Sequence, residues 1–211
     1  MNRLPRIGIL ESGASYHTFA LEDPRIASFF ARQIYLPTLC AADLADLDAL
    51  VIADRLHPGL LRRQAATLLA FANQGRTLVV LGEVEAHTWL PGVHWEARPT
   101  NFWWWLEGDD PGVRQRSPEH PMWQFVTLPD VTWHYHGFFR PPADSTPLVA
   151  LEEDGHEVGQ LLYEDRLSAG GRLVVTTLDP IYHHGSNFMP AATRFLENLL
   201  RWLQWELDRE R

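Results

Sequence analysis

The sequence has almost no cysteine: Cys40 is the single one among 211 residues. A lone cysteine excludes an internal disulfide framework and a structural zinc site built from several thiolates. The first residues also lack the long apolar stretch and the small-residue cleavage site of an export signal. These absences predict a cytoplasmic protein. Cys40 itself is expected to be a partly buried, unreactive thiol, because free cysteines are commonly buried.

Long hydrophobic runs and clusters of positive charge are also missing. No apolar run approaches the roughly 18 residues that a membrane helix needs. The formal net charge is −9, and Arg62-Arg63 is the one basic pair that stands out. A nucleic-acid groove would have little positive charge with which to neutralise phosphates. The sequence therefore predicts a soluble globular protein that binds neither nucleic acid nor membranes.

Common nucleotide-binding and serine-hydrolase motifs are absent. The sequence contains no Gly-x-Gly-x-x-Gly or Walker pattern, and "ESGAS" after the first apolar run is too short to indicate a nucleotide. Ser12 and Ser15 lie in a predicted loop without a Gly-x-Ser-x-Gly elbow. No familiar nucleophile is therefore visible.

Four compact apolar runs are typical of strands that are buried on both faces of a parallel sheet. A helical stretch with Gly75 at its end joins the second run to the third. This alternation predicts an open, mostly parallel, doubly wound sheet with helices on both faces, and the length favours one domain over residues 1–211. The apolar runs cover residues 6–10, 49–54, 77–82 and 172–179.

Between and after these runs the signals are more mixed. Asp23 and Pro24 predict the start of a helix that continues to about Gln33, and a strand over 33–39 is interrupted by Pro37 and so belongs near a sheet edge. Residues 83–130 lose periodicity and are read as a long loop or lid. A strand over 131–139, a hairpin at Asp154-Gly155 and a final helix from Pro190 to about Asp208 complete the predicted elements.

The order and pattern of these segments resemble the ThuA-like branch of the class I glutamine amidotransferase-like superfamily. The resemblance covers most of the chain and is carried by "RIGIL", "LDALVIADRLHPGLLRRQAATLLAFANQGRTLVVLGE", "SPEHPMWQFVTLPDVTWHYHGFF", "GGRLVVTTLDPIYHHG" and "FLENLLRWLQ". It implies a flavodoxin-like three-layer sandwich. ThuA-like proteins are associated with sugar utilisation, so the resemblance also implies a carbohydrate ligand.

The two catalytic positions of the superfamily are empty in this chain. Active members carry a cysteine in a Gly-x-Cys-x-Gly elbow and a histidine after the last strand. Here the elbow reads "GEVEA" from Gly82 to Ala86, and Asp179 stands where the histidine is expected. The resemblance therefore implies a relative that does not hydrolyse glutamine.

A carboxylate follows each of the four apolar strands. Ligands of doubly wound folds bind in the crevice at the carboxyl ends of the strands, so these acids can bind a cation, accept hydrogen bonds from sugar hydroxyls or share a proton. The alternative is that each acid caps the helix or loop that follows it. The four residues are Glu11, Asp54, Glu83 and Asp179.

Histidines form a second pattern. His134 and His136 are two residues apart on a predicted strand and so point to one face, and His183-His184 follow Asp179 closely. Two histidines and a carboxylate can bind zinc or iron, so a divalent metal is a candidate cofactor. The alternative is that these histidines, which aromatic residues flank, are hydrogen-bonded packing residues. His17 and His57 also lie near strand exits.

Five of the nine tryptophans fall between Trp89 and Trp105. In "NFWWWLEGDD" a strand places Trp103 and Trp105 on one face and Trp104 on the other, which leaves a ring for a sugar to stack on. The alternatives are a hydrophobic cluster under the loop and a subunit interface.

Three functions follow from the sequence. The first is a non-glutaminase domain that binds a small polar ligand, a carbohydrate, at the strand ends. The second is a metal-dependent hydrolase or isomerase that uses the histidines and Asp179. The third is a structural domain that forms homo-oligomers and carries a vestigial site. The candidate ligand-binding residues are Glu11, Asp54, Glu83, Trp104, His134, His136, Asp179 and His184, and the candidate metal ligands are His134, His136, His183, His184 and Asp179.

Overall fold

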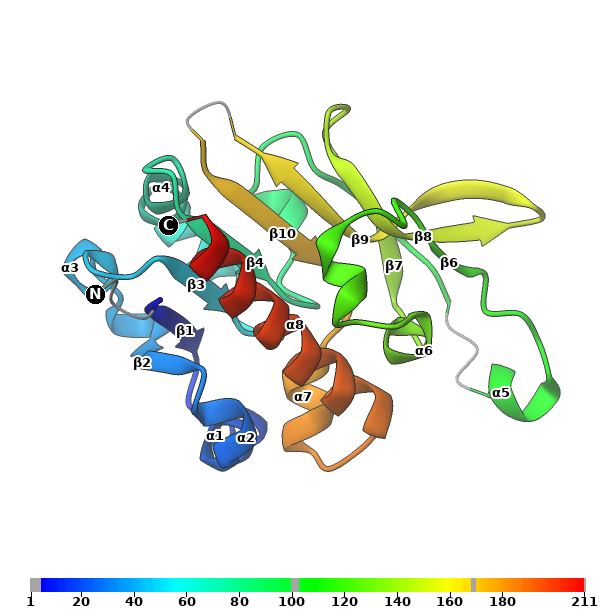
Figure 1. The fold of residues 1–211 in the computed structure, drawn as a ribbon, viewed down its shortest axis with the longest axis horizontal. Coiled ribbons are helices and arrows are strands. Elements are labelled where there is room, and N and C mark those ends of the chain that lie inside the picture. Colours follow the sequence, from blue (N-terminus) through cyan, green and yellow to red (C-terminus); the bar gives the residue numbers. More distant parts are fainter. Residues whose placement is uncertain (1–4, 100–102, 168–169, 211) are drawn as a thin grey trace.

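The computed structural model describes residues 5–99, 103–167 and 170–210, and a single ten-stranded sheet runs through these residues. Its strand order is β2-β1-β3-β4-β10-β9-β7-β5, with β8 beside β9 and β6 beside β8. Figure 1 shows a parallel half that carries the N-terminal strands and a second half that extends away from it. Helix α8 (Pro190–Arg209) crosses one face of the parallel half and packs on α7 (Pro180–Gly185) and α6 (Leu128–Val131).

The parallel half confirms the predicted doubly wound architecture. All residues of β3 and β4 are buried, as expected for strands that are covered on both faces. β2 lies at the edge of the sheet, which is where the nearby Pro37 placed it. The five strands of this half are β1 (Ile7–Glu11), β2 (Phe30–Tyr35), β3 (Ala49–Ile52), β4 (Thr77–Val80) and β10 (Arg172–Thr176).

The other half of the sheet is antiparallel. β9 pairs antiparallel with β10 and so joins the two halves. The hairpin between β8 and β9 turns at Asp154 and Gly155, which both have positive φ, as predicted for this Asp-Gly pair. The strands are β5 (His94–Ala97), β6 (Val113–Gln115), β7 (Gly137–Arg140), β8 (Thr146–Glu153) and β9 (His156–Arg166).

The helices pack against this sheet and fill its connections. Helix α4 covers most of the stretch predicted to be helical before Gly75, and α8 has the predicted extent. None of the helices in the described ranges is long and apolar enough to cross a membrane. The remaining helices are α1 (Ser15–Glu22), α2 (Pro24–Ala27), α3 (Ala41–Leu44), α4 (Pro58–Ala72) and α5 (Trp104–Glu107), with 3-10 turns η1 (Leu36–Thr38), η2 (Ala86–Thr88) and η3 (Pro121–Gln124).

The predicted helix from Pro24 to about Gln33 is wrong over its second half. Asp23 caps α2 as expected, and its side chain accepts the N–H of Arg25 at 2.9 Å. The helix nevertheless ends at Ala27, and β2 begins at Phe30 and pairs with β1. Sheet pairing has overridden the helical spacing of the apolar residues. Helix α1 begins at Ser15, within the loop predicted after the first strand.

The strand predicted over residues 131–139 begins late. Residues 128–131 form α6, which Thr127 and Asp130 stabilise through a capping box, and β7 starts only at Gly137. The indole N–H of Trp133 donates to the carbonyl of Asp130 at 2.9 Å. His134 and His136 therefore lie in an irregular connection, so strand alternation does not orient them.

Three further sequence expectations differ from the structure, in whole or in part. Cys40, expected to be partly buried, is exposed at the start of α3. The three consecutive tryptophans do not form a strand: Trp103 precedes the short helix α5, while Asn101 and Phe102 fall outside the described residues. Segment 83–130 holds β5 and β6, which pair with β7 and β8, so part of this segment extends the sheet.

Candidate functional site

Gly82 brings the ends of three parallel strands close together. It follows β4 with a φ of +59°, and a β-carbon at this position would lie 2.6 Å from Cβ of Asp54 and 2.7 Å from Cβ of Asp179. Asp54 follows β3 and Asp179 follows β10, the two strands that flank β4. Because this glycine has no side chain, both acids can pack against its backbone at the carboxyl ends of the strands.

Asp54 anchors the helix that follows β10. Its carboxylate is fully buried and accepts the backbone N–H groups of Ile181 at 2.7 Å and Tyr182 at 3.1 Å. These donors belong to the first turn of α7, so Asp54 caps a helix that is distant in sequence and not the element that follows it along the chain. Burial, reinforced by the charge of Asp179, raises the pKa of Asp54 well above its usual range. The buried imidazole of His17 lies 2.9 Å from the backbone carbonyl of Asp54 and so holds the chain in place at the end of β3.

Asp179 is held by an arginine that the sequence analysis did not select. Its Oδ2 accepts from Nε of Arg55 at 2.9 Å and from Nη2 at 2.6 Å. The same guanidinium lies 3.2 Å from Oε2 of Glu83 and 3.8 Å above the ring of Tyr182. Burial acts to raise the pKa of Asp179, but hydrogen bonds and charge from His183 and Arg55 outweigh it and lower the pKa. The sequence feature that could have identified Arg55 is its position immediately after Asp54, the acid at the end of β3.

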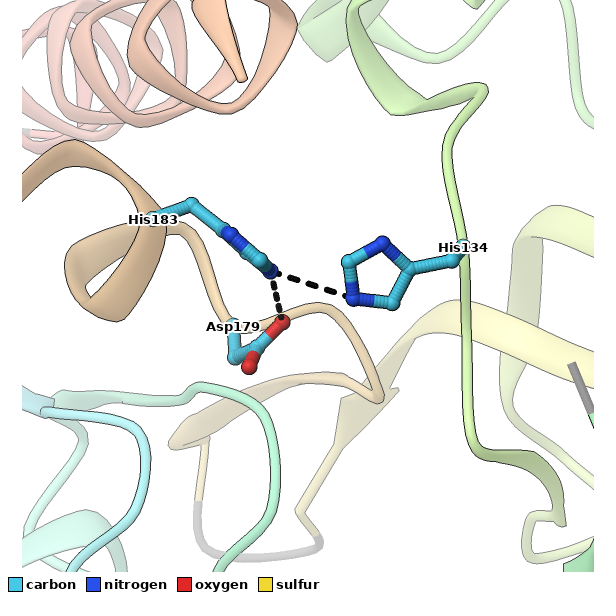
Figure 2. A group of neighbouring side chains, drawn as sticks. All are labelled: His134, Asp179 and His183. Carbon is cyan, nitrogen blue, oxygen red and sulfur yellow. Dashed lines mark hydrogen bonds and ion pairs between the residues drawn. The ribbon is translucent and has the colours of Figure 1, made fainter. Parts of the chain in front are cut away.

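Two histidines complete this buried group. Nε2 of His183 lies 3.2 Å from Oδ1 of Asp179 and 3.2 Å from Nε2 of His134. Figure 2 shows the two imidazoles pointing toward each other above the carboxylate. All three side chains are buried, and burial, together with the nearby charge of His183, lowers the pKa of His134 to about 4. His134 is therefore a neutral imidazole near pH 7. We call His134, Asp179 and His183 the His-Asp-His cluster.

Glu83 and His136 lie beside this cluster. Nε2 of His136 is 3.7 Å from Oε1 of Glu83, and its ring centroid is 5.4 Å from that of His134. Their side chains are about one-third exposed, at 34% for Glu83 and 32% for His136. The structure therefore brings six of the sequence-selected residues into one neighbourhood. These are Asp54, Glu83, His134, His136, Asp179 and His183.

Three other sequence-selected residues lie apart from the cluster. The carboxylate of Glu11 accepts the backbone N–H of Gly13 within its own turn. His184 turns away from its neighbour His183 and contacts Oγ1 of Thr193 at 3.0 Å and the carboxylate of Asp23 at 3.3 Å. His57 caps α4 by accepting the N–H of Gly59 at 3.0 Å. Local turn and helix-end contacts account for all three.

The two larger cavities that adjoin the site differ in their lining. One, of about 340 Å³, lies over the elbow that follows β4. Its lining includes Glu83 and the rings of Trp95 and Phe139, and neither ring was among the candidate ligand-binding residues. The other, of about 730 Å³, is lined mainly by aromatic and aliphatic side chains and includes Trp104 and His134. The first is lined by Pro58, Gly82, Glu83, Glu85, Ala86, His87, Trp95 and Phe139.

Comparison with solved structures identifies the fold. The crystal structure of a "putative GMP synthase" component from Thermoplasma acidophilum matches with a TM-score of 0.60 and 9% sequence identity, over 100% of both chains. No family model and no curated protein matches the sequence. At this identity the likeness establishes the fold alone. The chain therefore shares the mixed α/β fold of this structure, which confirms the fold class that the resemblance implied, while the amidotransferase-like superfamily and its ThuA-like branch stay predictions.

Proposed function

We propose that this chain is an amidotransferase-like domain that does not hydrolyse glutamine and that binds a small carbohydrate at the elbow after β4. The observation that carries the proposal is the cavity of about 340 Å³, where carboxylates and aromatic rings face the same space. This volume lies at the lower end of the range found for small-molecule sites. The ThuA-like resemblance, with its association with sugar utilisation, supports the same ligand class.

The absence of a nucleophile argues against glutaminase chemistry. Val84 occupies the third position of the elbow, where active members carry the cysteine, and its side chain is fully buried. Cys40 lies elsewhere in the fold, where it caps α3 together with Asp43. A covalent acyl intermediate needs an activated nucleophile beside a base. The activity in the printed name of the structural neighbour is therefore not transferred to this chain.

The lining of the elbow cavity suits a polyhydroxylated ring. Glu83 and Glu85 offer carboxylate oxygens, which accept hydrogen bonds from hydroxyl groups and are stronger acceptors than neutral groups. The rings of Trp95 and Phe139 lie 5.2 Å apart on another part of the lining and offer apolar surface for the C–H face of a sugar. A ligand with both a polar rim and an apolar face matches both halves of this lining.

A titration against a panel of monosaccharides and disaccharides tests the proposal. Binding is measured by calorimetry and by tryptophan fluorescence, and at least one sugar is expected to bind saturably. Glu85→Gln should weaken this sugar about tenfold, because it removes a charge-assisted hydrogen bond. Trp123→Phe is the matched control, since Trp123 lies outside the cavity lining and donates to the carbonyl of Arg116. Absence of saturable binding, or equal affinity in wild type and Glu85→Gln, contradicts the proposal.

Self-association is a second candidate, favoured by a group of exposed apolar side chains. Trp103 and Trp105 are each 59% exposed, and Leu106 and Phe188 are each 61% exposed. Exposed aromatic groups of this kind are typical of subunit interfaces. Sedimentation velocity over a range of concentrations tests this proposal: a dimer in wild type should dissociate in Trp105→Ser, and a monomer at all concentrations contradicts it.

A further inference from the structure

The His-Asp-His cluster has the spacing of a metal site. Its three ligand atoms lie within 4.8 Å of one another, and Nε2 of His183 is 3.2 Å from both of its neighbours. Zinc–nitrogen bonds of about 2.0–2.1 Å in a tetrahedral site place neighbouring ligand atoms about 3.3 Å apart. A cation can therefore bind among these atoms with only small movements. Figure 2 shows that the atoms converge from two separate segments of the chain.

Hydrogen bonding alone satisfies this cluster poorly. If Nε2 of His183 carries a hydrogen, Oδ1 of Asp179 and Nε2 of His134 compete for it, because both lie 3.2 Å away. A cation removes the competition, because it accepts the lone pairs of all three ligand atoms at once.

The local charge also favours a cation. Asp179 and Glu83 carry two negative charges, and Arg55 contributes one positive charge that it shares between them. These two carboxylates and the single guanidinium together have a formal charge of −1. Arg55 binds Oδ2 of Asp179, so Oδ1 stays directed at the histidines. The guanidinium therefore fixes the orientation of the carboxylate, as residues that hydrogen-bond to metal ligands without touching the metal commonly do.

The fold holds the ligands in place and leaves one position open. Asp179 and His183 are four residues apart at the start of α7, which Asp54 anchors through the N–H of Ile181. His134 comes from the connection between α6 and β7 and also lines the aromatic cavity of about 730 Å³. Three protein ligands leave a fourth coordination position for water or a ligand, as in catalytic zinc sites.

We propose that His134, Asp179 and His183 bind one divalent transition-metal ion, of which zinc is the best match, with the open position toward the aromatic cavity that His134 lines. Two imidazoles and one carboxylate suit zinc and ferrous iron better than calcium or magnesium, which prefer sets of oxygen ligands. This site does not depend on carbohydrate binding at the elbow, because no carbohydrate contact contributes to it.

Metal binding to the whole chain, purified without a histidine tag and stripped with a chelator, tests the proposal. Zn²⁺, Co²⁺, Mn²⁺ and anaerobic Fe²⁺ are added separately, and bound metal is measured after gel filtration. One Zn²⁺ per chain is expected, and Co²⁺ should give the intense visible absorption of a four-coordinate site. At a hundredfold excess over Kd, Zn²⁺ should raise Tm by about 5–10 °C. Failure of all four ions to bind overturns the proposal.

Variants identify the ligands. His134→Gln should weaken Zn²⁺ binding by more than roughly 10–100-fold, which is the loss expected when a residue that only holds a metal ligand in place is removed. His183→Gln should do the same. His184→Gln is the matched control, because His184 is adjacent in sequence but contacts Asp23 and Thr193 instead. Circular dichroism and the metal-free Tm show whether each variant folds. If a variant does not fold, the Co²⁺ spectrum of the wild-type protein still tests the proposal. Equal Zn²⁺ affinity in His134→Gln and wild type, or an equal loss in His184→Gln, overturns the assignment.

Discussion

Nη2 of Arg55 lies 2.6 Å from Oδ2 of Asp179, whose side chain is 2% exposed, and this ion pair joins the ends of β3 and β10. Removal of one partner of a buried ion pair leaves an uncompensated charge. Arg55→Met should therefore lower the free energy of unfolding by about 3 kcal/mol, measured by urea denaturation at neutral pH.

A surface ion pair supplies the control for this prediction. Arg62 pairs with Glu85 at 3.1 Å, but both side chains are about half exposed, at 47% and 52%. Exposed pairs of this kind contribute about 0–1 kcal/mol, so Arg62→Met should have a small effect. If both variants lose the same amount, burial of Asp179 does not determine the cost.

The contact between Gly82 and the two acids predicts a second large effect. A β-carbon in Gly82→Ala would lie 2.6 Å from Cβ of Asp54, and φ is +59°. Overpacking and the left-handed backbone together should cost about 2–4 kcal/mol. Gly75→Ala is the matched control, because Gly75 also has a positive φ, of +81°, but no atom of the described residues lies within 4 Å of the added carbon. Gly75→Ala should lower the free energy of unfolding by only about 1 kcal/mol. Urea denaturation of both variants measures this, and similar losses in Gly82→Ala and Gly75→Ala would contradict the steric argument.

Much of this fold could be predicted from the sequence, because buried parallel strands have a strong apolar signal. The runs that became β1, β3, β4 and β10 were found in this way. Weaker signals failed where tertiary pairing decides the structure. The apolar spacing after Pro24 indicates a helix, yet Phe30 begins a strand because it can pair with β1.

The candidate site could be predicted only in part. Strand-end position identified Asp54, Glu83 and Asp179, since parallel strands in one sheet end at the same edge. Side-chain direction could not be predicted: His183 and His184 are adjacent in sequence but contact different groups. Arg55 was missed because its role depends on the approach of Asp179, which is distant in sequence.

The capping box of α6 predicts a pH-dependent contribution to stability. Asp130 accepts the N–H of Thr127 at 3.0 Å and Nε of Arg194 at 2.8 Å. Burial acts to raise the pKa of Asp130, but these hydrogen bonds and the arginine charge outweigh it and hold the pKa below the usual value of 3.8. The folded pKa is below the unfolded one, so the carboxylate stabilises the fold above about pH 4, and this is lost as the pH falls through the folded pKa.

Asp130→Asn should therefore lower the free energy of unfolding by about 1–2 kcal/mol at pH 7. The difference from wild type should shrink as the pH falls below about 4, because both side chains are then uncharged. Urea denaturation over a pH series measures this. Glu197→Gln, which removes a partly exposed i,i+4 partner of Arg201, is the control and should show a smaller difference at pH 7. A pH-independent loss in Asp130→Asn would mean that the charge of Asp130 is not involved.

Arg172 tests whether a buried charge network stabilises the start of β10, opposite the strand ends that carry the candidate site. Its side chain is 2% exposed, and Nη2 lies 2.8 Å from Oε1 of Glu206 on α8. Arg172→Met should cost about 3–5 kcal/mol, because the buried carboxylate of Glu206 loses its buried partner and keeps the more exposed Arg209. The double variant Arg172→Met with Glu206→Leu should recover much of this loss, because it removes both charges and keeps apolar volume. If the double variant is no more stable than Arg172→Met, the loss comes from packing around the arginine stem, and the ion pair between β10 and α8 contributes little.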